Sequence, residues 1–231
     1  MNDSSSTQND LINILLVLVL ATVIMIITQR TLRSLIFIYA AQSALLAAMA
    51  MVLFWKTDDW VLPGIAALTV ASKVIVIPYM LRKIQKRLNI RRDVEFRYLS
   101  PITSVALSAI LIFIVYSAFP QALRDLWPEK QFYLSAVIGV SIMLTGMIVV
   151  FSRRKMITKI VGYLTMENGV LLFGLFVAEL PFIIEALIVI DLIMLTVLAT
   201  ILAFGIDSTI DDFHKRLKMF NSIHFKRQGK P

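Results

Sequence analysis

Residues 157–206 read ITKIVGYLTMENGVLLFGLFVAELPFIIEALIVIDLIMLTVLATILAFGI, two apolar runs that meet at Leu180-Pro181. Each run has roughly the 20 residues that a membrane-spanning helix needs. Pro181 suits the first turn of a helix, where the missing backbone N–H of proline costs nothing. The stretch therefore predicts a tight helical hairpin within a membrane. Each run carries one carboxylate near its centre, Glu167 in the first and Asp191 in the second.

The rest of the chain repeats this pattern of long apolar runs. Of its 231 residues, 58% are hydrophobic and only 16% are charged, and the mean hydropathy is +0.81. Soluble domains have about 25% charged residues. We predict an all-α polytopic membrane protein that forms one transmembrane domain over residues 1–231, with a polar N-terminal tail (1–10), a basic loop (82–99) and a basic C-terminal tail (207–231). The seven predicted spans are Leu11–Gln29, Leu32–Trp55, Trp60–Leu81, Pro101–Phe119, Phe132–Phe151, Ile157–Leu180 and Pro181–Ile206. The first ten residues have no basic n-region, which argues against a cleaved signal peptide.

Basic residues are concentrated in every second connection between the predicted spans, and this distribution predicts the orientation of the chain in the membrane. With seven spans, 19 of the 23 lysines and arginines fall on one side of the membrane and three on the other, and Lys73 lies inside a span. This asymmetry is the positive-inside pattern of short cytoplasmic loops. We therefore expect the N-terminus outside and the C-terminus in the cytoplasm of a prokaryotic inner membrane. Trp55, Trp60 and Trp127 then lie at the outer boundary, where tryptophan is enriched.

The basic stretch Arg82–Arg97 has three interpretations. It can orient the chain and attract anionic lipid head groups, which is the simplest explanation. It can also dock a cytoplasmic partner subunit. Nucleic-acid binding is disfavoured, because no recognition module accompanies the charge.

The residue inventory excludes several kinds of chemistry from this chain. It has no cysteine, so it has no thiolate for an iron–sulfur cluster and no thiol nucleophile. Its two histidines, His214 and His224, both lie in the polar C-terminal tail. No nucleophile, metal or phosphate motif is present, so we expect no catalysis by this chain alone and no cofactor bound to it.

Ionisable residues at the middle of the spans are the candidate functional site. A helix rises about 1.5 Å per residue and the hydrocarbon core is about 30 Å thick. By this count Glu167, Asp191 and Lys73 all lie near the midplane, and the hairpin places the two acids on adjacent antiparallel helices. A charged residue at that depth costs roughly 2.5 kcal/mol or more to insert. Glu185 lies nearer the outer surface, where a helix N-terminus favours negative charge.

Two interpretations of these groups stay open. Glu167 and Lys73 could form a buried ion pair that only orients helices. Two acids and a lysine at one depth instead favour a path that passes protons, because burial disfavours the charged form of each group and lets it respond to a neighbour. Glu185 is either part of that path or a residue that stabilises a helix start. Gln42 and Asn168 fit interhelical hydrogen bonds better than proton transfer.

At these residues the chain resembles component E of hydrogenase-4, a membrane subunit of formate hydrogenlyase-type complexes. The matching stretches are Tyr39-Ala40-Ala41-Gln42-Ser43, Lys73-Val74-Ile75-Val76-Ile77-Pro78, Gly162-Tyr163-Leu164-Thr165-Met166-Glu167-Asn168-Gly169, and Pro181 through Asp191 including Glu185. The last three spans also look like the K subunit of NADH:quinone oxidoreductase and the C subunit of multisubunit cation/proton antiporters. The K subunit has a glutamate in each of two neighbouring helices; Glu167 matches the first, and Asp191 takes the second place with a side chain one methylene shorter.

The resemblance implies a non-catalytic subunit of a complex-I-like, energy-converting assembly of the group 4 hydrogenase type. Antiporter-like membrane subunits would be its neighbours, and peripheral redox subunits would carry nickel–iron and iron–sulfur centres. This chain would contribute to proton translocation through Glu167, Asp191, Lys73 and Glu185. The alternatives are a subunit of a cation/proton antiporter and a purely structural subunit of a membrane arm. A stand-alone transporter is disfavoured, because no pair of Gly/Pro-broken helices appears.

Overall fold

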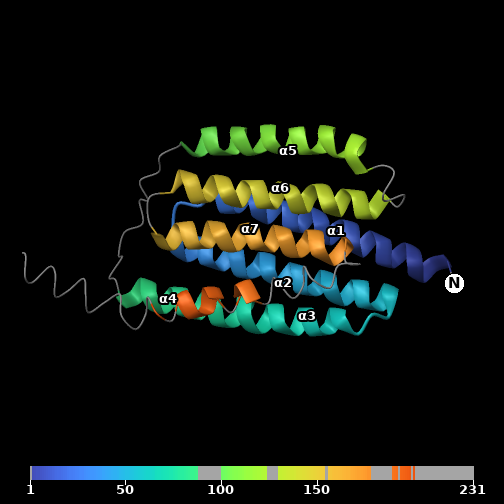
Figure 1. Ribbon diagram of the computed structural model, residues 1–231, viewed down its shortest axis with the longest axis horizontal. Coiled ribbons are helices and arrows are strands. Elements are labelled where there is room, and N and C mark those ends of the chain that lie inside the picture. Colours follow the sequence, from blue (N-terminus) through green and yellow to red (C-terminus); the bar gives the residue numbers. More distant parts are fainter. Residues whose placement is uncertain are drawn as a thin grey trace, which may run out of the picture.

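The computed structural model describes residues 2–87, 100–123, 130–153, 156–177, 189–191, 193–198 and 200. These residues form a bundle of long helices lying side by side (Figure 1). The elements are α1 (Asn2–Thr28), α2 (Leu32–Thr57), α3 (Val61–Thr69), the π-helix η1 (Val70–Val76), α4 (Ile77–Arg87), α5 (Pro101–Leu123), α6 (Lys130–Ser152) and α7 (Met156–Val177). The all-helical prediction is confirmed for the described part of the chain.

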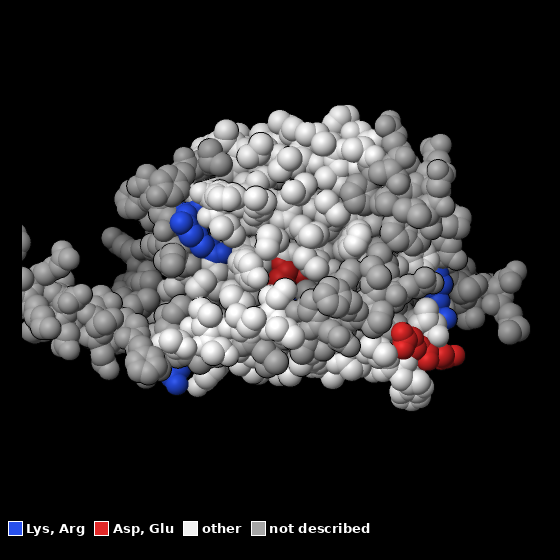
Figure 2. Space-filling view, viewed as in Figure 1, with Lys and Arg blue, Asp and Glu red and all other residues white. Residues whose placement is uncertain are grey.

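Four described helical stretches are long and apolar enough to cross a membrane: Thr7–Thr28, Leu32–Thr57, Val61–Lys86 and Phe132–Ser152. Two shorter apolar stretches, Ile102–Ala118 and Val189–Leu198, belong to the predicted fourth and seventh spans. Large apolar side chains remain exposed on the outside of the bundle, as on Phe37 (63%) and Phe113 (70%). Figure 2 shows charged side chains gathered toward the ends of the molecule, and a largely uncharged belt interrupted by acidic atoms near its middle. These features are typical of a protein embedded in lipid.

The first helix begins at Asn2, so residues 2–10 continue α1 where the sequence predicted a polar tail. Gln8 contributes one contact in this stretch, because its side-chain Nε2 donates to the carbonyl oxygen of Trp55 at 3.3 Å. The extra turns thus meet the far end of α2. The predicted basic C-terminal tail (207–231) and most of the predicted basic loop (82–99) lie outside the described residues. Helix α4 extends into that loop, through Arg82, Lys83 and Lys86.

The turn between α2 and α3 shows why tryptophans mark that end of the bundle. Asp58 closes α2 in the left-handed conformation (φ 55°), and its N–H donates to the carbonyl oxygen of Phe54 at 2.9 Å. Aspartate tolerates this conformation better than most residues. Asp59 Oδ1 accepts the N–H of Val61, the first residue of α3, at 3.0 Å. Trp55 and Trp60 flank the turn and are 62% and 81% exposed.

The third predicted span contains Pro78, and the structure has the π-helix η1 shortly before this proline. Proline cannot donate a backbone hydrogen bond, which weakens the regular pattern around it. The N–H of Ile77 accordingly bonds to the carbonyl oxygen of Ser72, five residues back. A π-helical turn changes the direction of the side chains on it and often occurs at functional sites. Lys73 is the central charged residue of this segment.

Glycines let α6 and α7 pack with their backbones in near contact. A Cβ atom on Gly146 would lie 2.5 Å from the backbone nitrogen of Met166, and one on Gly169 would lie 2.6 Å from the carbonyl oxygen of Gly139. A Cβ on Gly162 would lie 2.9 Å from the backbone nitrogen of Val150. Small residues permit such close approach, and dispersion contacts then hold the helices together in lipid. These glycines recur at seven-residue spacing on each helix, so they face each other at two levels of the antiparallel pair.

Arg153 falls in the connection between the predicted spans Phe132–Phe151 and Ile157–Leu180, yet it lies inside the bundle and is 1% exposed. Its Nη2 donates to carbonyl oxygens at the end of α1, at 2.9 Å to Gln29, 3.2 Å to Ile27 and 3.5 Å to Ile26. The last carbonyls of a helix have no intrahelical partner, and a cation there also complements the helix dipole. Arg153 therefore ties the end of α6 to the end of α1.

Replacing Arg153 with methionine should lower the free energy of unfolding by roughly 1.5–3 kcal/mol, the usual loss for hydrogen bonds to a charged group. The measurement is equilibrium unfolding in detergent micelles, followed by helical circular dichroism. Arg33→Met is the matched control, because Arg33 is exposed; it should change stability by no more than roughly 0.5 kcal/mol. Equal losses in the two variants would contradict a specific role for Arg153.

Candidate functional site

Lys73, Glu167 and Asp191 come together inside the bundle, and we call them the buried charge cluster. The Nζ atom of Lys73 lies 3.2 Å from Oε1 of Glu167 and 3.4 Å from Oδ1 of Asp191. The three residues are 1%, 2% and 6% exposed, respectively. The sequence predicted one depth for all three groups, and their mutual contacts agree with it. The sequence also predicted the two acids on adjacent helices, and in the structure both of them contact the same atom, Nζ of Lys73.

Each member of the cluster comes from a different element. Lys73 lies on η1, Glu167 on α7, and Asp191 on the short helical segment 189–191. Lys73 is the thirteenth residue of the 26-residue span Val61–Lys86, and Glu167 is the twelfth of 22 residues in α7. Neither therefore lies near the end of its helix. The aspartate side chain, although shorter than the glutamate expected from the resemblance, still reaches Lys73.

Ser72 links the π-helix to the second acid. Its Oγ lies 3.5 Å from Oδ2 of Asp191, and it also donates to the carbonyl oxygen of Leu68 at 2.8 Å. The shorter of these bonds holds the hydroxyl against its own helix, which is common for serine in apolar helices. Ser72 and Lys73 are consecutive, so the π-helical turn directs both of them to the same carboxylate.

The contacts within the cluster are ion pairs without the directional geometry of hydrogen bonds. Lys73 Nζ, both carboxylate oxygens of Glu167 and Oδ1 of Asp191 are buried and form no hydrogen bond with the described residues. Two carboxylates and one ammonium carry one excess negative charge. Unpaired charge is costly in a low-dielectric interior. The cluster therefore holds two acidic side chains and one basic side chain, all of them buried.

A second polar contact lies beside Glu167, between α7 and α2. Asn168 Nδ2 donates to Oε1 of Gln42 at 3.1 Å and to Oγ of Ser43 at 3.0 Å. Ser43 Oγ in turn donates to the carbonyl oxygen of Tyr39 at 3.1 Å, and all four residues are 0% exposed. Hydrogen bonds of this kind join helices within lipid. The structure thus brings together Gln42 and Asn168, which the sequence analysis named as interhelical contacts.

The sequence prediction did not name several residues of the site, although each lies close in the sequence to a residue that it did name. Ser72 and Ser43 are direct neighbours of Lys73 and Gln42. Tyr39 precedes Gln42 by three positions and so shares its helix face. Glu185 lies outside the described residues, as does Trp127, and both stay predictions. In the described part of the chain, no group of three or more histidine, cysteine, aspartate or glutamate side chains is arranged to hold a metal ion.

Comparison with protein-family models, with curated proteins and with solved structures finds no match to this chain.

Proposed function

We propose that this chain is a non-catalytic membrane subunit that moves protons between the members of its buried charge cluster. The observation that carries the proposal is the placement of Lys73 Nζ within 3.4 Å of two buried carboxylates on different helices. A cation between two acids can pair with either of them, and the acid left over then takes up a proton. Ionisable groups within membrane spans are rare and mark proton relays in pumps and transporters.

The host of this subunit is proposed to be a complex-I-like, energy-converting assembly of the group 4 hydrogenase or formate hydrogenlyase type. The resemblance of the Gly162–Gly169 and Lys73–Pro78 stretches to hydrogenase-4 component E supports this host. Antiporter-like subunits would then be its membrane neighbours, and redox centres would reside in peripheral partners. Isolation of the intact assembly from native membranes tests the host: a nickel–iron subunit should co-purify, whereas cation/proton antiporter subunits without it would favour the antiporter alternative.

The proposed topology has seven spans in a prokaryotic inner membrane, with the N-terminus outside. The charge asymmetry of the connections supports it. Within the described residues, Trp55 and Trp60 lie at the α2–α3 turn, and the basic residues of α4 lie at the opposite end of that helical hairpin. Labelling of single cysteines introduced at Thr57 and Lys83 tests the orientation, because the chain has no native cysteine. A membrane-impermeant maleimide should label the first position and not the second in intact cells.

Replacing Glu167 with glutamine or Asp191 with asparagine should lower the rate at which the assembled complex moves protons. A positioned group that transfers protons typically contributes large rate factors, so we expect a loss of roughly tenfold or more in translocation rate. Proton movement is followed with a pH-sensitive dye in inverted membrane vesicles. The same preparations are analysed by native electrophoresis to establish how much complex has assembled.

Asp58→Asn is the matched control, because it removes an exposed carboxylate far from the cluster, and asparagine also accepts the left-handed conformation. It should leave translocation unchanged. Normal proton movement in fully assembled Glu167→Gln complex would refute the proposal. Failure of assembly, with normal transport in whatever complex survives, would instead assign the cluster a purely structural role.

A further inference from the structure

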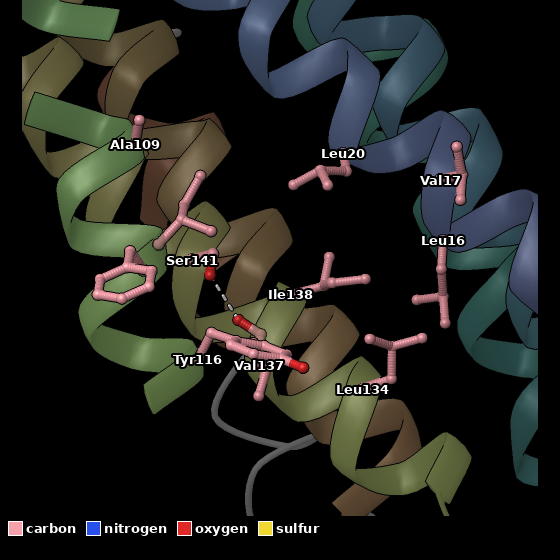
Figure 3. Close-up of a pocket in the computed structure, with 11 residues that line it drawn as sticks. Leu16, Val17, Leu20, Ala109, Tyr116, Leu134, Val137, Ile138 and Ser141 are labelled. Carbon is pink, nitrogen blue, oxygen red and sulfur yellow. Dashed lines mark hydrogen bonds between the residues drawn. The ribbon is translucent and has the colours of Figure 1, made fainter. Parts of the chain in front are cut away.

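A second feature of the bundle lies away from the charge cluster, between α1, α5 and α6. These three helices form a pocket of about 490 Å³ that is open on one side. Leu16 and Val17 line it from α1, Ala109 and Tyr116 from α5, and Val137 and Ser141 from α6. Figure 3 shows these side chains arranged around the space between the three helices.

The pocket has a buried floor and an exposed rim. On the floor, Leu16 is 0%, Val137 is 3% and Ser141 is 1% exposed. On the rim, Val17 is 66% and Tyr116 is 56% exposed. The pocket therefore opens through the outer surface of the bundle. Its lining residues all fall within the apolar stretches Thr7–Thr28, Ile102–Ala118 and Phe132–Ser152, so the opening faces the apolar part of the bilayer.

The lining offers almost nothing to a polar ligand. The Ser141 hydroxyl already donates to the carbonyl oxygen of Val137 at 2.7 Å (Figure 3). The other polar side chain of the lining is Tyr116, on the exposed rim. Water requires two to four polar partners, which this floor lacks. An unfilled space would forfeit dispersion contacts along its whole lining. Both arguments favour an apolar occupant.

The size of the pocket favours a flexible chain over a single protein side chain. A methylene group is similar in size to a water molecule, which takes up about 30 Å³ in the liquid. At about 490 Å³ the pocket has room for many such groups, more than one side chain supplies. The hydrocarbon chains of lipids are the most abundant apolar groups around a membrane protein.

We infer that the pocket between α1, α5 and α6 is a binding site for one acyl chain of a membrane lipid. The chain inserts past Val17 and Tyr116 and lies against Leu16 and Val137, while its head group stays outside the pocket. The site requires only that the helices lie in a bilayer, so it stands independently of the proton-transfer proposal.

The test uses the full chain in its native membrane. The cells are given a palmitic acid analogue that carries a diazirine and an alkyne, and they incorporate it into their phospholipids. The protein is purified in mild detergent, irradiated, and digested to map the labelled residues. Label should persist after purification and concentrate around the pocket. Equal labelling of the exposed apolar surface elsewhere, for example at Ile75 (60% exposed), would overturn the inference. This measurement needs no variant.

Ala109→Trp fills the pocket and should lower its labelling by roughly fivefold or more. Ala118→Trp is the matched control, since Ala118 is exposed on α5 and does not line the pocket; it should leave the labelling unchanged. A photoreactive amino acid at Val17 identifies what covers the rim: lipid adducts support the inference, and a cross-link to another polypeptide overturns it.

Discussion

Replacing Lys73 with methionine should destabilise the protein by roughly 3–5 kcal/mol, the usual cost of removing one partner of a buried ion pair. Methionine has a similar length and no charge, so the volume of the site is nearly preserved. The variant leaves two carboxylates close together at 2% and 6% exposure with no cation. The measurement is equilibrium unfolding in detergent micelles near neutral pH, with the yield of folded protein as a second readout.

Two further variants separate the loss of charge balance from the loss of packing. Adding Glu167→Gln and Asp191→Asn to Lys73→Met removes every charge from the cluster and should recover most of the lost stability, because an uncharged site has no unpaired ion to bury. Lys83→Met, at an exposed position of α4, should stay within roughly 0.5 kcal/mol of the native chain. If the triple variant is as unstable as Lys73→Met alone, the cause is packing rather than charge.

Replacing Gly146 with alanine should also have a large effect, through the contact between α6 and α7. The added Cβ would lie 2.5 Å from the backbone nitrogen of Met166 and 2.8 Å from the carbonyl oxygen of Gly162. These atoms belong to a helix backbone and cannot rotate away, so the two helices must separate. Overpacking of this kind costs roughly 1–3 kcal/mol, and occasionally more. Met166 directly precedes Glu167, so a shift there also disturbs the charge cluster.

Gly64→Ala provides the matched control for this prediction. A Cβ on Gly64 would meet nothing within 4 Å, and the residue lies within helix α3. Alanine is favoured over glycine in a helix, so this variant should be stabilised by roughly 0.5–1 kcal/mol. Thermal unfolding of both variants in the same detergent gives opposite signs if close packing is the cause. A stable Gly146→Ala protein would show that α6 and α7 can separate freely.

Much of the architecture follows from residue pattern alone. Apolar runs of about 20 residues are sufficient to predict helices, because a lipid-exposed backbone must satisfy its own hydrogen bonds. Counting residues from the ends of the runs was also enough to place Lys73 and Glu167 at one depth, since the rise of a helix is constant. The helical start at Asn2 was missed because a polar stretch has no apolar pattern to mark it as helix.

Sequence by itself therefore determined the helices, the apolar exterior and the level of the ionisable groups along their helices, because each depends on local periodicity and on the constant rise of a helix. Only the tertiary structure decided which groups meet. The π-helical turn before Pro78 directs Lys73 to both acids, glycines bring α7 against α6, and Arg153 turns inward to cap α1. These contacts depend on how neighbouring helices rotate and approach one another, and that is a property of packing between distant segments.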